Sequence, residues 1–418
     1  MKVLVVGSGA REHAIAWKFH TSTRNNGVFC APGNAGTGEF AVNLDIDVSD
    51  TRAILSAVNE YGIKLVFIGP EVPLSRGLAD ELRKNSIPTV GPGADGAKLE
   101  SSKAYSKEFM LRHQIPTAKA RIVKNSGELE AALKDFQLPL VVKKSGLAAG
   151  KGVLETSDLV RAREFAESQL KDGEVVIEEF LKGYEISIFA LSDGKNYLLC
   201  PPAADYKKAG DGNQGPNTGG MGAVCPVPWF DASLMPEIEE TIIRPSFQGL
   251  RNDGIDFRGI LYFGLMITAE GPKVLEYNVR FGDPEAQAVI PLMETDFANL
   301  FEAVANQTLE TQQLSISPLQ SICVVVAADG YPDEYRKNLK VELPDIRLEK
   351  RQHLFHASTM ERDGELVTGG GRCFSVVGKG TELLKARNRC YELASQVKFP
   401  GAWYRKDIGN RIFGEDAD

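Results

Sequence analysis

The stretch Lys2-Val3-Leu4-Val5-Val6-Gly7-Ser8-Gly9-Ala10-Arg11-Glu12 places an apolar run directly before a glycine-rich turn. We expect Lys2–Val6 to form a buried strand and Arg11–His20 a helix, because a short apolar run that ends in glycine favours a strand. The same alternation continues with strands at 28–30, 65–68 and 89–90 and helices at 51–60 and 78–84. This rhythm predicts a doubly wound parallel sheet over residues 1–100, with ligands bound at the carboxyl ends of its strands.

The remainder of the chain changes to an α+β pattern. Residues 209–222 form a polar glycine-rich segment that we expect to be a loop, and residues 259–268 and 273–278 are expected to pair as a hairpin. We therefore expect an α/β and α+β multidomain protein. Its parts are an N-terminal domain (1–100), a central domain (101–325) that contains a subdomain at 116–190, and a small C-terminal α+β domain (326–418).

The composition is that of a globular protein. Of 418 residues, 43% are hydrophobic and 25% charged, which excludes a disordered chain. The net charge of −8 argues against nucleic acid and anionic membranes as partners. No run approaches the roughly 20 apolar residues that span a bilayer. The six cysteines are scattered without a CxxC pair, so we expect a cytoplasmic, reducing environment.

The turn at Gly7–Glu12 opens a helix, where backbone N–H groups can face an anion. A dinucleotide site and a simple tight turn are the alternatives. Two features weaken the dinucleotide site: Glu12 replaces the third glycine of GxGxxG, and no acidic residue closes the strand at 28–30.

A second glycine-rich loop spans Gly146–Gly152. It is not a Walker A loop, because three residues rather than four separate Gly146 from Gly150 and Gly152 replaces the Ser or Thr that would hold magnesium. Such a loop between antiparallel strands can fold over a triphosphate, but it can also be a surface turn. Lys143, at the end of an apolar strand, argues against the surface turn because a half-buried lysine needs an anionic partner.

The segment Val176–Leu181, followed by Glu185, suits adenosine. An extended hinge offers a backbone donor and acceptor to the adenine edge, and a nearby carboxylate can accept the ribose hydroxyls. An edge strand with solvated carboxylates is the alternative.

The strand Lys273–Arg280 is the most informative in the chain. Glu276 and Asn278 are two residues apart and so share a face, and two hard oxygen ligands beside a phosphate suit Mg²⁺. Arg280 falls on the same face, where it can neutralise a transferring phosphoryl group. The alternative is a solvated strand face, which the acidic turn Phe281–Glu285 makes less favourable.

The loop that contains Pro216–Gly222 is long enough to be functional. Thr218 and the neighbouring glycine N–H groups could hold a phosphate, and Asp205 could hold a cationic amine. The five histidines form no nucleophile or metal pattern, and no GxSxG elbow supports acyl-enzyme chemistry.

Together these strings resemble the ATP-grasp superfamily and, within it, the phosphoribosylamine–glycine ligase family. The strings that carry the resemblance are Val5–Ala14, Ala31–Thr37, Gly69–Glu71, Leu99–Lys103, Gly146–Gly152, Ile177–Leu181, Pro216–Gly222, Glu276–Glu285 and Arg405–Gly409. They run in the expected order from residue 1 to about residue 410.

The resemblance implies that ATP phosphorylates the carboxylate of glycine and that the amine of 5-phosphoribosylamine attacks the glycyl phosphate. The catalytic residues would be Arg280, Asp205 and Lys143. ATP would be held by lysines, the loop and the hinge: Lys103, Lys143, Gly150, Lys151, Gly152, Glu178, Glu179, Phe180, Leu181 and Glu185. The two substrates would contact Gly9, Arg11, Glu12, Asp205, Asn217, Thr218, Gly219, Gly220 and Arg280. Glu276 and Asn278 would bind Mg²⁺ or Mn²⁺, residues 116–190 would be a mobile lid, and the enzyme would be a monomer, with a dimer left open.

Three departures from the family pattern are present. Lys143-Lys144-Ser145-Gly146 replaces Lys-Ala-Asp-Gly, Tyr206-Lys207-Lys208 replaces His-Lys-Arg, and the segment 259–268 carries no carboxylate. Other readings remain: a related carboxylate–amine ligase of purine metabolism, a catalytically inactive ATP-grasp binding module, and an NAD-dependent oxidoreductase. The oxidoreductase leaves Glu276–Glu285 unexplained, and the inactive module would lack the lysines and the metal pair.

Overall fold

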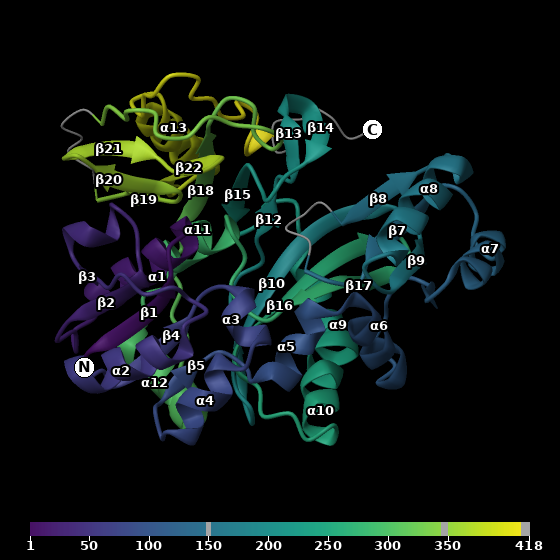
Figure 1. Cartoon of the computed structure of the whole chain (residues 1–418), viewed down its shortest axis with the longest axis horizontal. Helices are drawn as coiled ribbons and strands as arrows, with labels where there is room; N and C mark the ends of the chain where they lie inside the picture. Colours follow the sequence, from purple (N-terminus) through teal and green to yellow (C-terminus); the bar gives the residue numbers. More distant parts are fainter. Residues whose placement is uncertain (148–151, 344–349, 411–418) are drawn as a thin grey trace.

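The computed structural model describes residues 1–147, 152–343 and 350–410. Figure 1 shows the N-terminal sheet below the C-terminal sheet, with a long central sheet leading away to a smaller sheet at the far end. Within the described residues, no helix is long and apolar enough to cross a membrane.

The N-terminal sheet is parallel, with the strand order β3-β2-β1-β4-β5. Its strands and intervening helices are β1 (Val3–Gly7), α1 (Ala10–His20), β2 (Val28–Pro32), β3 (Val42–Asn43), α2 (Thr51–Tyr61), β4 (Leu65–Ile68), α3 (Glu71–Ser75), α4 (Leu78–Lys84) and β5 (Thr89–Val90). Every residue of β1 is buried, and its side chains alternate between two hydrophobic clusters. A strand covered on both faces reads as a continuous apolar run. The expected doubly wound sheet is confirmed.

A smaller antiparallel sheet has the order β6-β9-β7-β8. Its elements are β6 (Ala120–Val123), α7 (Ser126–Lys134), β7 (Leu140–Lys144), β8 (Val153–Thr156), α8 (Leu159–Leu170) and β9 (Val175–Glu179). We call it the β6–β9 unit, and it has a hydrophobic cluster of its own. The expected subdomain of residues 116–190 runs past this sheet, because the next strand, β10 (Gly183–Asp193), pairs with strands of the central sheet instead.

The central sheet has the order β11-β10-β16-β17. Besides β10 it contains β11 (Tyr197–Leu199), β16 (Arg258–Thr268) and β17 (Gly271–Asn278). The expected hairpin is present as β16 and β17, and a β-bulge interrupts their register beside Gly264.

The C-terminal sheet has the order β12-β15-β18-β22-β19 and carries α13 (Leu383–Ala394). Its strands are β12 (Ala204–Asp205), β15 (Gly222–Cys225), β18 (Gln320–Ala327), β19 (Gln352–His356) and β22 (Arg372–Gly380). A Cβ at Gly378 would lie 2.2 Å from the Ala386 carbonyl oxygen, so glycine permits the close approach of α13. Three of these strands begin before residue 326, so the sheet crosses the expected boundary.

The segment expected as a loop, 209–222, contains strand structure. β13 (Lys208–Gly210) and β14 (Gln214–Asn217) form a two-stranded sheet, and β15 begins at Gly222. Glycine content concealed this hairpin, because its strands lack the apolar alternation that marks a strand in sequence. The remaining elements are η1 (Thr37–Glu39), α5 (Ala94–Ser101), α6 (Lys103–Arg112), η2 (Asp211–Asn213), η3 (Ala232–Leu234), α9 (Met235–Ile238), η4 (Glu239–Ile243), α10 (Arg244–Asn252), α11 (Glu285–Val289), η5 (Ile290–Leu292), α12 (Phe297–Asn306), η6 (Leu309–Thr311), β20 (Thr359–Arg362) and β21 (Glu365–Thr368).

Candidate active site

The end of β17 carries the predicted metal ligands. Glu276 and Asn278 are both half-buried, whereas Tyr277 between them is fully buried, so the two polar side chains share the face away from the core. The bulge leaves Leu275 without a cross-strand partner, since Gly264 pairs with Glu276 and the next pair skips Leu275. Bulges re-aim groups near active sites, and here the freed Leu275 carbonyl faces a lysine.

That lysine is Lys143 of β7, whose Nζ donates to the Leu275 carbonyl oxygen at 3.1 Å and lies 2.8 Å from Glu178 Oε2. Burial works to lower the pKa of Lys143, but the Glu178 carboxylate raises it on balance. Lys103, at the start of α6, donates to the Gly146 carbonyl oxygen at 3.4 Å. Burial lowers the pKa of Lys103, although Glu276 opposes this. The Glu276 carboxylate also acts to raise the pKa of both lysines, so the three groups belong to one charged cluster.

Glu276 lies among cations. Burial works to raise its pKa, but Lys207, Lys143 and Lys103 lower it on balance, so Glu276 is a carboxylate at neutral pH. Among the described residues, no group of three or more His, Cys, Asp or Glu side chains is placed to hold a metal ion. The pair Glu276 and Asn278 fits Mg²⁺, which binds through one or two protein oxygens and completes its shell with phosphate and water oxygens.

Arg280 lies just beyond β17, in an acidic setting that sequence reasoning missed. Its Nη2 is 2.6 Å from Glu100 Oε1 and its Nε is 3.5 Å from Glu71 Oε2. Burial would lower the pKa of Arg280, but Glu100 and Glu71 raise it. The Nε is buried and makes no hydrogen bond within the described part of the chain, and Nη2 lies 3.4 Å from Asn278 Oδ1. Arg280 is therefore held by two carboxylates, and its guanidinium lies beside Asn278, one of the two expected metal ligands.

The expected adenine hinge divides into two parts. Glu178 is almost fully buried, its strand is paired on both sides, and its carboxylate contacts two lysines, so the structure does not support an adenine contact for it. Glu179 is also engaged, since its N–H and carboxylate bind the carbonyl and N–H of Lys119. Phe180 and Leu181 follow β9 without strand pairing, and Phe180 is 41% exposed. These two residues remain the candidates for adenine.

Glu185, the expected ribose ligand, is on β10 at the other side of the hinge. Its Oε2 lies 2.5 Å from Lys207 Nζ, and both side chains are partly exposed. Burial works to lower the pKa of Lys207, while Glu185 and Glu276 raise it well above its ordinary value. Lys207 therefore connects the expected ribose and metal positions.

In the Asn217–Gly220 stretch, hydrogen bonds within the protein use the donors of Thr218, Gly219 and Gly220. Both the N–H and the hydroxyl of Thr218 donate to the Lys207 carbonyl oxygen, and the hydroxyl accepts from the Gly220 N–H at 3.0 Å. The Gly219 N–H donates to the Tyr331 hydroxyl. The expectation that Thr218 and these N–H groups cradle a phosphate is therefore not supported, because the loop itself satisfies them.

Asp205 lies next to Gly220 of this stretch. A Cβ at Gly220, whose φ is +105°, would lie 2.7 Å from Asp205 Oδ1 and 2.4 Å from Pro284 Cδ, so the loop packs closely over the carboxyl. Oδ1 is buried and has no hydrogen-bond partner among the described residues. Burial, followed by the nearby Glu285 carboxylate, raises the pKa of Asp205 well above its ordinary value.

The N-terminal turn contacts the same region. Arg11 Nη1 donates to the Phe281 carbonyl oxygen at 3.0 Å, and Arg11 Nε lies 2.6 Å from Glu12 Oε1. The Gly9 N–H donates to Glu12 Oε2 at 2.7 Å. The expected anion at this helix N-terminus is therefore replaced by the chain's own carboxylate, which also disfavours a dinucleotide there.

Arg372, the first residue of β22 in the C-terminal sheet, also contacts this region. Its Nη1 donates to the carbonyl oxygens of Gly219 at 2.6 Å and Asp283 at 3.0 Å, and lies 3.3 Å from Asp283 Oδ1. Burial works to raise the pKa of Asp283, but Arg372 lowers it. Arg372 lies directly after Gly369-Gly370-Gly371, which was the only signal for it in the sequence.

Several site residues escaped sequence reasoning because their partners are distant in the chain. They are Glu71, Glu100, Lys107, Lys207, Asp283, Glu285 and Arg372. Of the expected lid-loop residues, Gly150 and Lys151 lie outside the described residues. Gly152 accepts a hydrogen bond from the Lys144 N–H at the start of β8.

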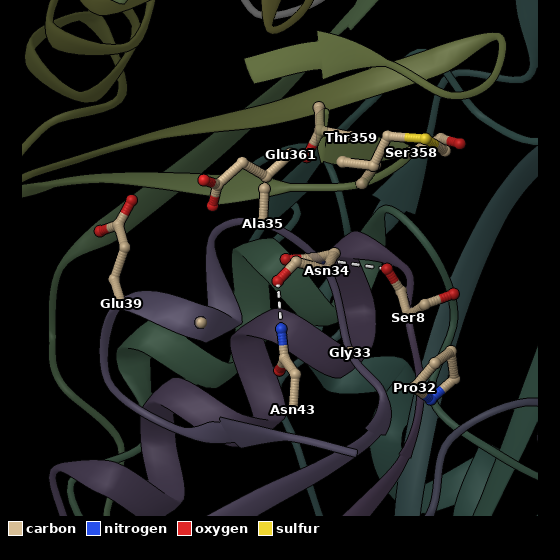
Figure 2. A pocket seen from close by; sticks show the side chains of 13 residues that line it. Ser8, Pro32, Gly33, Asn34, Ala35, Glu39, Asn43, Ser358, Thr359 and Glu361 are labelled. Carbon is tan, nitrogen blue, oxygen red and sulfur yellow. Dashed lines mark hydrogen bonds between the residues drawn. The ribbon is translucent and has the colours of Figure 1, made fainter. Parts of the chain in front are cut away.

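A separate cavity of about 580 Å³ lies between the N-terminal and C-terminal sheets. Figure 2 shows that the turn after β2 faces the β19–β20 connection across it, with Asn34 bonded to Ser8 and Asn43. None of the expected site residues lines this cavity, although Ser8 is next to Gly9.

Three family models cover most of the chain in order. Phosphoribosylglycinamide synthetase, N domain, matches residues 1–100, the ATP-grasp (A) domain of the same family matches 101–286, and its C domain matches 321–411. The chain is 41% identical over 415 residues to the phosphoribosylamine–glycine ligase of Caldanaerobacter subterraneus subsp. tengcongensis, covering 98% of this chain and 99% of that protein. It is 41% identical over 418 residues to the ligase of the same name from Streptomyces coelicolor, covering 99% and 100%.

Structure agrees with sequence. The crystal structure of a phosphoribosylamine–glycine ligase from Thermotoga maritima superposes with a TM-score of 0.86 at 35% identity, covering 98% of this chain and 100% of that one. Within the ATP-grasp superfamily, the chain belongs to the phosphoribosylglycinamide synthetase family, the phosphoribosylamine–glycine ligases.

Proposed function

We propose that this chain ligates glycine to 5-phosphoribosylamine with ATP, giving glycinamide ribonucleotide, ADP and phosphate for purine biosynthesis. The observation that carries the proposal is the convergence of two lysines, a carboxylate–amide pair and an arginine at the end of β17: Lys103, Lys143, Glu276, Asn278 and Arg280. This set neutralises phosphate and supplies no protein nucleophile, as expected for phosphoryl transfer between small molecules.

ATP would lie between the β6–β9 unit and the central sheet. Phe180 and Leu181 would contact adenine and Glu185 the ribose, while Lys103 and Lys143 would contact the phosphates. Glu276 and Asn278 would hold Mg²⁺, which would supply charge neutralisation on phosphate oxygens when bound.

In the first step, a carboxylate oxygen of glycine attacks the γ-phosphorus of ATP, and the bond between that phosphorus and the ADP oxygen breaks. Arg280, whose guanidinium lies beside Asn278, would donate to the transferring phosphoryl group. In the second step, the nitrogen of phosphoribosylamine attacks the acyl carbon of glycyl phosphate, phosphate leaves, and the nitrogen loses a proton.

In this proposal Asp205 would take that proton. Burial raises the pKa of Asp205, which makes its carboxylate a stronger base, and Oδ1 has no hydrogen-bond partner among the described residues. The substrate amines would then lie beside Gly219 and Gly220, on the side of the loop where Arg372 holds Asp283.

We also propose that the protein acts as a cytoplasmic monomer. Sedimentation at micromolar concentration tests this, and a stable dimer with loss of activity on dilution would overturn it.

The experiment that tests the function is phosphate release from ATP·Mg²⁺ with glycine, with and without phosphoribosylamine generated from ribose 5-phosphate and ammonia. Release that requires both co-substrates is the expected result. Release without either, or none with both present, contradicts the proposal. The control is Lys124→Met, which changes a lysine exposed on the β6–β9 unit.

A further inference from the structure

Lys107 is a buried lysine for which the reaction has no direct use. It lies one helical turn after Lys103 on α6, and the side chain is only 2% exposed. Its Nζ lies 2.9 Å from Glu178 Oε1, donates to Thr117 Oγ1 at 2.7 Å and to the Ala118 carbonyl oxygen at 3.4 Å. An ammonium has three N–H donors, so these acceptors account for all of them. Lys107 therefore has no donor left for a ligand.

Glu178 connects Lys107 to the site. One carboxylate oxygen faces Lys107 and the other faces Lys143, so a single buried anion serves two buried cations. Burial works to raise the pKa of Glu178, but Lys143 and then Lys107 lower it, and the group carries one net positive charge. Among the described residues, Lys143 contacts Glu178 and the Leu275 carbonyl oxygen, and these contacts use two of its three N–H donors.

The group also joins two parts of the fold. Lys107 belongs to α6, Glu178 and Lys143 belong to the β6–β9 unit, and the Thr117 hydroxyl that Lys107 contacts donates to the Val274 carbonyl oxygen of β17 at 2.7 Å. Lys107 thus fixes the carboxylate relative to the strand that carries Glu276.

We propose that Lys107 is a positioning residue for ATP: by sharing Glu178, it leaves Lys143 with a positive charge that Glu178 does not fully neutralise. Within the described residues, Lys143 also keeps one N–H that can bind the nucleotide phosphates. Without Lys107, the charges of Glu178 and Lys143 cancel, and the pair has no net positive charge to attract the phosphates. The inference rests on the proposed ATP site and adds to it a residue that does not touch ATP.

The test measures ATP binding directly, by calorimetry, so that no turnover is needed. Lys107→Met is expected to weaken the Kd for ATP about tenfold, equivalent to about 1.4 kcal/mol. The KM for ATP should rise in parallel, while the KM for glycine and kcat should stay close to wild type, because Lys107 acts on ATP alone. Lys124→Met, which removes another lysine paired with a glutamate on the same unit, is the matched control and should leave the Kd unchanged.

The deciding variant is Lys107→Met combined with Glu178→Gln. Removing both buried charges frees Lys143 again, so the Kd for ATP should return to within about threefold of wild type, less than about 0.7 kcal/mol. If Lys107 had only a structural role, the double variant would bind ATP no more tightly than Lys107→Met, because it changes two buried residues instead of one.

An unchanged Kd in Lys107→Met, or a double variant as weak as the single one, overturns the inference. If Lys107→Met does not fold, the double variant still decides, because it keeps the single net positive charge of the wild-type group on Lys143 and should bind ATP within about threefold of wild type. A wild-type chain that fails to bind ATP overturns the proposed function itself, so the two failures are distinguishable.

Discussion

Replacing Arg280 by methionine separates the catalytic and structural parts of the site. The guanidinium is the 2.6 Å partner of Glu100, a carboxylate only 8% exposed, whose other oxygen accepts the Val279 N–H at 2.8 Å. Removing one partner of a buried ion pair costs about 3–5 kcal/mol, because the remaining charge is left without compensation. We expect Arg280→Met to lose stability of this order at pH 8.

The loss should depend on pH. Burial already raises the pKa of Glu100 above its ordinary 4.5 despite the opposing Arg280, and without Arg280 it rises further. The folded variant then holds a proton that the unfolded chain releases above about pH 4.5, so its stability falls as pH rises. Urea unfolding at pH 5 and pH 8 should therefore show the smaller loss at pH 5.

The matched control is Arg280→Met combined with Glu100→Gln, which removes both charges. We expect this pair to recover most of the stability but none of the activity, with kcat reduced about 10²–10³-fold, or about 3–4 kcal/mol, in both variants. Recovery of kcat in the double variant would refute the reasoning, because Arg280 would then act only by balancing Glu100.

Glu276→Gln should keep the fold yet lower kcat by about 10³-fold, about 4 kcal/mol, because an amide replaces the carboxylate that would hold the metal among Lys207, Lys143 and Lys103. Near-normal turnover in excess Mg²⁺ would contradict this. Asp205→Asn should remove the acidic limb of the pH profile of kcat, measured by phosphate release, and an unchanged limb would exclude Asp205 as the base. Burial lowers the pKa of His356 to about 4 from 6.5, so it binds a proton less readily folded than unfolded; stability should fall by about 3 kcal/mol as pH drops from 6.5 to 4. His356→Gln should flatten that slope in urea titrations, and an equally steep slope would assign it to other groups.

Local patterns predicted much of the fold. The apolar run of β1 and the alternation after it indicated the parallel sheet, and the spacing of residues 259–278 indicated the β16–β17 hairpin. The C-terminal sheet was harder, because β12 and β15 join it from more than a hundred residues before β22. Their pairing partners are set by tertiary packing, which local propensity does not report.

In the site, too, local sequence predicted what lies close together in the chain but not what distant residues bring together. Glu276, Asn278 and Arg280 lie on one short segment, so spacing alone placed them together. Sequence could not show that two lysines share Glu178, because Lys107 lies 71 positions earlier, in a different element. Lys103 and Lys107 are also both lysines of α6, and sequence alone does not tell which of them contacts the carboxylate. The phosphate contact expected of Thr218 stays a prediction. Sequence could not show that this polar loop satisfies its own donors, because only the hydrogen bonds to Lys207 reveal it.

The most direct test of the proposed mechanism traces the two carboxylate oxygens of glycine into the products. Glycine labelled with ¹⁸O in both carboxylate positions should transfer one labelled oxygen to the released phosphate and keep the other in glycinamide ribonucleotide, because the attacking carboxylate oxygen leaves with the phosphoryl group. Mass spectrometry of both products in one reaction measures this. Unlabelled phosphate, with glycinamide ribonucleotide formed, would contradict activation of the carboxylate by phosphoryl transfer at this site.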